Sequence, residues 1–98
     1  MSEPRRKVVV FGIDGGTLSL VGPWAKRGEL PNLSRLLGSG SSGALRSTLH
    51  PLTPQAWCSF LTGMNPGRHG VFDFGKRRED SYGLCLTDST DRRAPAIW

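Results

Sequence analysis

The sequence lacks the long apolar runs of membrane proteins, and we expect no secretory leader in it. No apolar run in its 98 residues approaches the roughly 20 that a membrane span needs. An apolar run over 8–13 follows the charged start, and Asp14 stops it before it reaches the length of a signal-peptide core. We therefore predict a cytoplasmic protein without a membrane span.

Cysteine is also scarce. Cys58 and Cys85 are the two cysteines, and neither belongs to a C-x-x-C pair. No zinc-finger spacing exists without such a pair, and a disulfide is not expected without a secretory signal. We therefore treat both residues as ordinary thiols.

Acidic residues are in the minority, 8 against 13 Lys and Arg, which gives a formal net charge of +5. The cations gather in three runs, at 5–7, 76–78 and 92–93. No aromatic residues interleave with these runs, and this weakens the case for nucleic-acid binding. We interpret the runs as solvated surface charge. Attraction of an anionic substrate and contact with nucleic acid are the alternatives.

The order of apolar segments predicts an α/β fold. Residues 7–13 are Val-rich and nearly continuously apolar, which is typical of a buried parallel strand. Leucines within 30–37 recur at helical spacing, and residues 44–49 alternate as a second strand would. The chain between these two strands is long enough for the crossover of a βαβ unit. Residues 71–74 and 82–86 are predicted to be further short strands.

The two ends of the sequence carry separate expectations. Residues 1–6 are basic and are predicted to be disordered. The last two residues, Ile97 and Trp98, are large and apolar, whereas most domains end in polar, frayed residues. We therefore expect that the chain was cut inside a domain, and that residues 7–98 are the incomplete N-terminal portion of that domain.

Thr53 begins the most distinctive stretch of the chain. Pro54 follows it, apolar residues then recur on one helical face, and Gly63 closes the run. This pattern predicts a helix with Thr53 as its N-cap and Pro54 as its first residue. The N-terminus of a helix also suits a phosphate group. The local residues leave two interpretations open, a simple helix cap and a phosphate site.

Asp14 follows the first predicted strand, in the stretch Asp14-Gly15-Gly16-Thr17. Open α/β sheets bind ligands at the carboxyl ends of their strands, so this carboxylate is well placed for a metal ion. An Asp-Gly turn is the plain alternative. The same stretch resembles the first phosphate loop of a sugar kinase with the actin-like ATPase fold. That fold requires a strand directly after Thr17, and the nearby Gly22-Pro23 argues against a long one.

A set of ordered motifs then points to one family. The motifs are Val-Val-Val-Phe-Gly-Ile-Asp-Gly at 8–15, Leu-Pro-Asn-Leu at 30–33, Ser-Thr at 47–48, Pro-Leu-Thr-Pro-Gln-Ala-Trp at 51–57, Ser-Phe-Leu-Thr-Gly at 59–63, and Asn-Pro-Gly-Arg-His-Gly-Val-Phe-Asp-Phe at 65–74. Together they resemble the N-terminal part of a type I phosphodiesterase / nucleotide pyrophosphatase, in the alkaline phosphatase superfamily. Each motif alone is weak, but the ordered set over 8–98 is specific.

The resemblance implies a doubly wound, alkaline-phosphatase-like sheet with flanking helices, and hydrolysis of a small-molecule phosphate ester. It implies two divalent metal ions, zinc in the first place and manganese as the alternative. Asp14 would ligate one metal. Thr53, nine positions before Thr62, would be the nucleophile and would also contact the metal. A phospho-threonine intermediate would then be hydrolysed by water. Nothing in the resemblance indicates the oligomeric state.

Two departures from the family pattern bear on function. Phe74 stands where many nucleotide pyrophosphatases carry an Asn that holds a phosphate oxygen, so the substrate is expected to differ from a nucleotide. The remaining metal ligands of the family, a set of Asp and His, would lie after residue 98. His69 resembles the family's loop histidine rather than a ligand. The 98-residue chain is therefore expected to be inactive and not stably folded by itself.

Two other functions stay open as alternatives. The first is the actin-like sugar kinase that would use residues 14–17, although it leaves the stretch 53–70 unexplained. The second is a non-catalytic binding module that uses the basic runs. Sulfatase chemistry is not favoured, because no Cys-x-Pro-x-Arg or Ser-x-Pro-x-Arg motif occurs.

Overall fold

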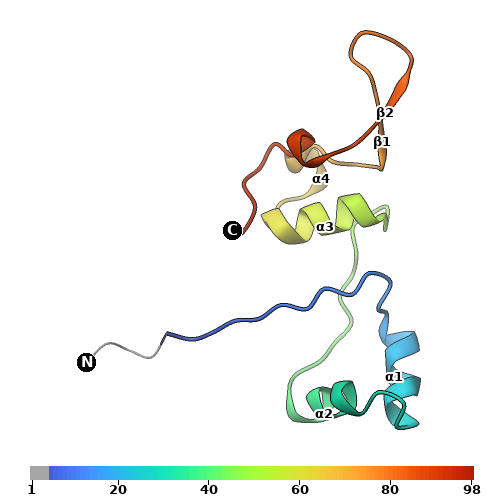
Figure 1. The fold of residues 1–98 in the computed structure, drawn as a ribbon, viewed down its shortest axis with the longest axis vertical. Coiled ribbons are helices and arrows are strands. Elements are labelled where there is room, and N and C mark those ends of the chain that lie inside the picture. The colour runs from blue at the N-terminus through green and yellow to red at the C-terminus, as the bar shows by residue number, and fades with distance from the viewer. Residues whose placement is uncertain (1–4) are drawn as a thin grey trace. The chain divides into compact units, whose positions relative to one another are not determined.

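The structure is a computed structural model, and it describes residues 5–98. The chain divides into two compact units, an N-terminal unit (Met1–Ala44) and a C-terminal unit (Leu45–Trp98). Each unit is described by itself, with its elements labelled in Figure 1. The predicted disordered segment 1–6 falls mainly on residues 1–4, which lie outside the described residues.

The N-terminal unit contains two helices that contact each other, α1 (Leu18–Lys26) and α2 (Pro31–Ser39). Thr17 caps α1, because its side-chain oxygen accepts a hydrogen bond from the Ser19 amide over 3.3 Å. α1 continues through Pro23 as a single helix. A proline inside a helix removes one backbone donor, and the neighbouring bonds can still hold the turn together. The predicted helix at 30–37 is confirmed by α2.

The predicted parallel sheet is not present in residues 5–98. Residues 7–13 are extended but pair with no strand, and their side chains stay exposed, Val8 by 82% and Phe11 by 86%. Residues 44–49 likewise form no strand. A strand exists only where its backbone finds a partner about 4.8 Å away. An apolar pattern identifies residues suited to burial, but it does not specify that partner.

The sheet that the described residues contain is an antiparallel hairpin in the C-terminal unit. β1 (Gly75–Arg77) pairs with β2 (Leu84–Leu86), with Lys76 opposite Cys85. β2 falls within the strand predicted at 82–86. The strand predicted at 71–74 is wrong, because pairing begins only at Gly75.

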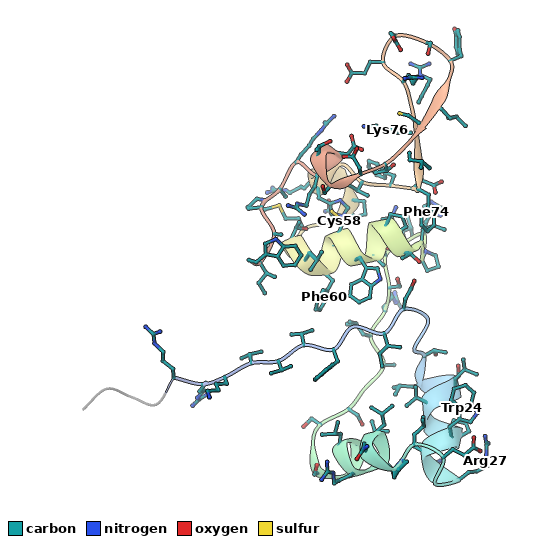
Figure 2. All side chains as sticks on the ribbon, in the orientation of Figure 1. Trp24, Arg27, Cys58, Phe60, Phe74 and Lys76 are labelled. Carbon is teal, nitrogen blue, oxygen red and sulfur yellow. The ribbon has the colours of Figure 1, made fainter. Side chains whose placement is uncertain are left out.

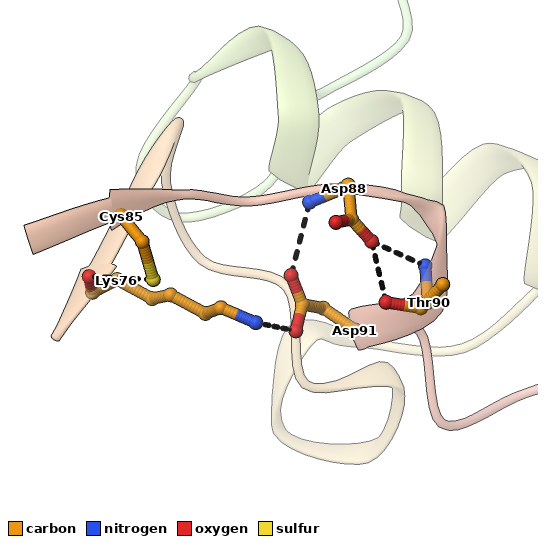
Figure 3. Close-up of polar contacts among 5 residues, drawn as sticks. All are labelled: Lys76, Cys85, Asp88, Thr90 and Asp91. Atoms are coloured by element: carbon orange, nitrogen blue, oxygen red, sulfur yellow. Dashed lines mark hydrogen bonds and ion pairs between the residues drawn. The ribbon is translucent and has the colours of Figure 1, made fainter. Parts of the chain in front are cut away.

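The hairpin is tied to a short 3-10 helix, η1 (Ser89–Asp91), by the charged contacts in Figure 3. Lys76 pairs with one carboxylate oxygen of Asp91, and the other oxygen accepts the Asp88 amide over 2.9 Å. The hydrogen bond from Lys76 lowers the pKa of the Asp91 carboxyl and raises that of its own ammonium group. One of the basic runs therefore has a structural role in the fold.

Two helices precede the hairpin, α3 (Thr53–Thr62) and α4 (Pro66–His69), and they pack against each other. Asn65 caps α4, because its side-chain oxygen accepts the Arg68 amide over 3.1 Å. Phe60 points to the side of α3 away from α4 and is 53% exposed (Figure 2). No helix among residues 5–98 has the length and apolar character needed to cross a bilayer.

The predicted helix after position 52 is confirmed, with a shift of one residue at its start. Leu52 is the N-cap, because its backbone is extended and its carbonyl accepts the Ala56 amide over 2.9 Å. Thr53 is therefore the first helical residue rather than the cap. Gly63 ends the helix in the left-handed region, with φ of 65°, as its position predicted.

Replacing Gly63 tests this helix end. No atom lies within 4 Å of a Cβ added at Gly63, so Gly63→Ala adds backbone strain without a clash. We expect a loss of about 1 kcal/mol in the free energy of unfolding. Gly63→Asn is the matched control, since Asn tolerates this conformation better and should cost less. Urea denaturation of the longest natural protein that contains this sequence measures both, and equal losses would contradict the explanation.

Candidate functional site

Thr53 stands at the N-terminal end of α3, where the backbone changes from extended to helical. Leu52 has φ of −95° and ψ of 140°, and Pro54 follows Thr53 within the first turn. Proline suits this turn because its missing N–H would have no partner inside the helix. The positive end of the helix dipole lies here and favours a negatively charged group. Thr53 thus keeps the local setting for which the sequence singled it out.

The segments that follow Thr53 in the C-terminal unit are held together by hydrogen bonds of His69. His69 is fully buried, with 0% exposure. Its Nδ1 accepts the Val71 amide over 3.1 Å, and its Nε2 lies 2.9 Å from Ser59 Oγ. Because Nδ1 accepts a hydrogen bond, the neutral ring carries its proton on Nε2 and donates it to Ser59.

This tautomer decides what His69 does. Nε2 has no lone pair to take a proton from Ser59, so the pair does not form a nucleophile and its base. The Nδ1 lone pair is already used by the amide of Val71, so the ring offers no electrons to a metal ion. The structure therefore gives His69 a structural role, in agreement with the sequence interpretation. Burial lowers the pKa of this imidazole below 6.5.

Thr62 and Gly70 lie at the ends of α3 and α4. Thr62 donates its hydroxyl to the Cys58 carbonyl over 2.7 Å and accepts the Met64 amide over 3.2 Å. Gly70 ends α4 with φ of 79°, and a Cβ there would lie 3.3 Å from the Arg93 side chain. The Thr-Gly and His-Gly landmarks are thus helix ends. They determine the path of the chain after α3 and α4, and we assign them no part in the reaction.

Gln55 is a buried residue that the sequence analysis did not single out. It is 3% exposed, and its Nε2 donates to the Phe72 carbonyl over 3.3 Å. Its Oε1 is buried without a hydrogen-bond partner among the residues that the structure describes. An unsatisfied buried acceptor costs about 1–3 kcal/mol. The sequence could have indicated this residue by its place in the first helical turn, because a Gln there often bonds backbone amides at the helix start.

Asp14 lies in the N-terminal unit, in a turn between the extended segment and α1. The Gly16 amide donates to the Ile13 carbonyl over 3.2 Å, and Gly15 has φ of 69°. The Asp-Gly turn interpretation is therefore confirmed, and Asp14 is exposed to solvent in this turn. Asp14 and Thr53 belong to different units, so their proximity stays a prediction.

The donor atoms of these two residues suit a divalent ion. A carboxylate oxygen and a hydroxyl oxygen are accepted by Zn²⁺ and by Mn²⁺. Within residues 5–98, no group of three or more His, Cys, Asp or Glu side chains is close enough together to hold a metal ion. That Asp14 and Thr53 belong to one ligand set stays a prediction.

The C-terminal unit has cavities large enough for small ligands. One, about 570 Å³, lies between the hairpin and η1 and has Lys76 and Arg93 among its lining residues. A second, about 360 Å³, is lined by the last residues of α3 and by residues 95–97. A third, about 280 Å³, adjoins the start of α3, where Pro54 lines it, and is also lined by segments after α4. Burial raises the pKa of Cys58, so its thiol is protonated at neutral pH.

The comparison with known proteins decides the family. The family model for type I phosphodiesterase / nucleotide pyrophosphatase matches residues 8–98. The chain belongs to this family. No curated protein and no solved structure matches it.

Membership confirms the resemblance drawn from the motifs. The family consists of phosphoric ester hydrolases and implies an alkaline-phosphatase-like α/β fold. The structure also bears on the sugar kinase, which would need a strand directly after Thr17. A helix begins there instead, at Leu18. The remaining alternative, a basic binding module, has no comparable support.

The buried imidazole of His69 predicts how stability depends on pH. Its folded-state pKa lies below 6.5, so the unfolded chain takes up this proton first as the pH falls. The stabilising contribution is complete above pH 6.5 and is lost below it, at no more than about 1.4 kcal/mol per pH unit. We expect His69→Gln to remove this part of the slope when the longest natural protein that contains this sequence is denatured with urea between pH 7.5 and pH 5. A slope that survives in His69→Gln would contradict the assignment of this pH dependence to His69.

Proposed function

We propose that the protein hydrolyses a small-molecule phosphate ester in a metal-dependent reaction, with Thr53 as the nucleophile and Asp14 as a metal ligand. The observation that carries this proposal is the place of Thr53, the first helical residue of α3 in a chain of a phosphoric ester hydrolase family. We expect the reaction in the longest natural protein that contains this sequence, since a complete ligand set requires more than Asp14 and Thr53.

The proposed reaction has two displacements at phosphorus. Thr53 Oγ1 loses its proton to solvent and forms a bond to phosphorus, while the bond to the leaving alcohol oxygen breaks. Water then attacks the phosphorus, releases Thr53 and takes its place on the phosphate. The start of α3 stabilises negative charge on Oγ1 and on the phosphate. Bound metal ions would supply further charge neutralisation and favour the alkoxide form of the hydroxyl.

The residue at position 74 bears on which ester is bound. Phe74 is 56% exposed and offers no hydrogen-bonding side chain. A phosphate oxygen that an Asn at this position would hold must find its donor elsewhere. We therefore propose that the ester is not a nucleotide. Aryl and alkyl diesters and monoesters are the candidates that an assay should compare.

Removing the hydroxyl of Thr53 is the first test. We expect Thr53→Ala to lower kcat for an aryl phosphodiester by about 10³-fold or more, because no other group would form the covalent intermediate. Thr53→Ser keeps a hydroxyl and should keep measurable turnover. The assay is release of the aryl alcohol by the longest natural protein with zinc or manganese. Undiminished hydrolysis in Thr53→Ala would refute the assignment.

Replacing the carboxylate of Asp14 is the second test. Asp14→Asn keeps the size of the side chain and removes its charge, so we expect fewer metal ions per protein in elemental analysis after dialysis. Asp73→Asn is the matched control, since Asp73 is an exposed carboxylate with no proposed role. Equal metal content in Asp14→Asn and the unsubstituted protein would remove Asp14 from the ligand set.

A further inference from the structure

The first turn of α3 contains a buried amide that the proposed reaction does not use. Gln55 lies two residues after Thr53 and is 3% exposed. Its Nε2 donates to the backbone carbonyl of Phe72, 17 residues later, over 3.3 Å. Within residues 5–98 its Oε1 is buried and accepts no hydrogen bond. The amide is therefore only half satisfied.

A half-satisfied amide is a poor means of stabilising a core. An apolar side chain of the same length would fill the space of Gln55 without burying an acceptor that has lost its water. Buried polar groups without partners are few in native structures, and each calls for an explanation. The explanation must therefore lie in what the bond from Nε2 holds in place.

That bond is among those that tie α3 to the chain from α4 onward. Gln55 ties the first turn of α3 to Phe72, Ser59 ties the second half of the helix to His69, and the Leu61 carbonyl accepts the Ile97 amide over 2.8 Å. The tie at Gln55 is two residues from Thr53, and the tie at Ser59 is six residues away. A helix held at several points along its length cannot pivot about any one of them. The tie nearer the N-terminus therefore sets the direction of the first turn.

We propose that Gln55 is a positioning residue for Thr53. Its bond to the Phe72 carbonyl holds the first turn of α3, and so holds the hydroxyl of Thr53 in line with the phosphorus of the ester. This inference rests on the proposed function. It adds to that function a residue that orients the nucleophile. It also explains why an amide occupies position 55 although its Oε1 has no partner, because the Nε2 donor of the same amide is needed.

Gln55→Met tests this role, because methionine has the same length and no polar atom. In the longest natural protein with zinc, we expect kcat for an aryl phosphodiester to fall by about tenfold or more while KM changes by less than about twofold. The melting temperature should stay level or rise, since the buried acceptor is gone. Gln55→Leu is the second variant, used in the same way if methionine does not fold.

Ser59→Ala is the matched control at the tie to His69. It leaves the Nε2 proton of buried His69 without an acceptor, so we expect a lower melting temperature. It is farther from Thr53, so kcat should stay within about twofold of the unsubstituted protein. Gln55→Met should therefore lower kcat without lowering the melting temperature, and Ser59→Ala should lower the melting temperature without lowering kcat. A role for Gln55 in packing alone would not give this contrast.

Hydrogen exchange gives a readout that does not need activity. In Gln55→Met the amides of residues 55–58 should exchange faster, while those of 59–62 keep their rates. Unchanged exchange at 55–58, or a kcat within about twofold of the unsubstituted protein while Thr53→Ala is inactive, would overturn this inference and leave the proposed function standing. Hydrolysis that persists in Thr53→Ala would overturn both.

Discussion

The buried ring of His69 is the contact on which the C-terminal unit depends. The ring contacts Ser59 of α3 and accepts the Val71 amide from the segment after α4. The backbone carbonyl of His69 accepts the Arg93 amide over 2.9 Å. The buried apolar side chains of this unit are few and small, namely Cys58, Val71 and Ala94. Directional hydrogen bonds therefore determine how the segments sit around α3.

The sequence predicted the helices of this unit better than its strands. Proline near the start and glycine at the end mark α3 within one residue, because both act through local backbone geometry. The strand predicted over 7–13 depended on pairing with a distant segment, and a local pattern cannot specify that partner. The same limit applies to the site. The setting of Thr53 is local and was predicted, whereas Gln55 matters through a carbonyl 17 residues away and was missed.

The basic side chains that stabilise the fold and the residues of the proposed reaction lie in different parts of the chain. The basic run at 76–78 takes part in the fold, with Lys76 bound to Asp91 and the Arg77 guanidinium 5.7 Å from the centre of the Tyr82 ring. The proposed chemistry uses few groups, the hydroxyl of Thr53, the carboxylate of Asp14 and the helix start. The family landmarks at 62–63 and 69–70 are helix ends. They shape the turn after α3 so that Gln55 and Ser59 meet their partners.

The central claim is that Thr53 forms a covalent bond to phosphorus. The most direct measurement is mass spectrometry of the longest natural protein, quenched in acid during turnover of an aryl phosphodiester and digested with trypsin. The account predicts that the peptide 47–68 gains the mass of the transferred phosphoryl ester, with fragmentation placing it on Thr53. An adduct on another residue, or turnover with no adduct under conditions that trap the intermediate of a related hydrolase, would contradict it.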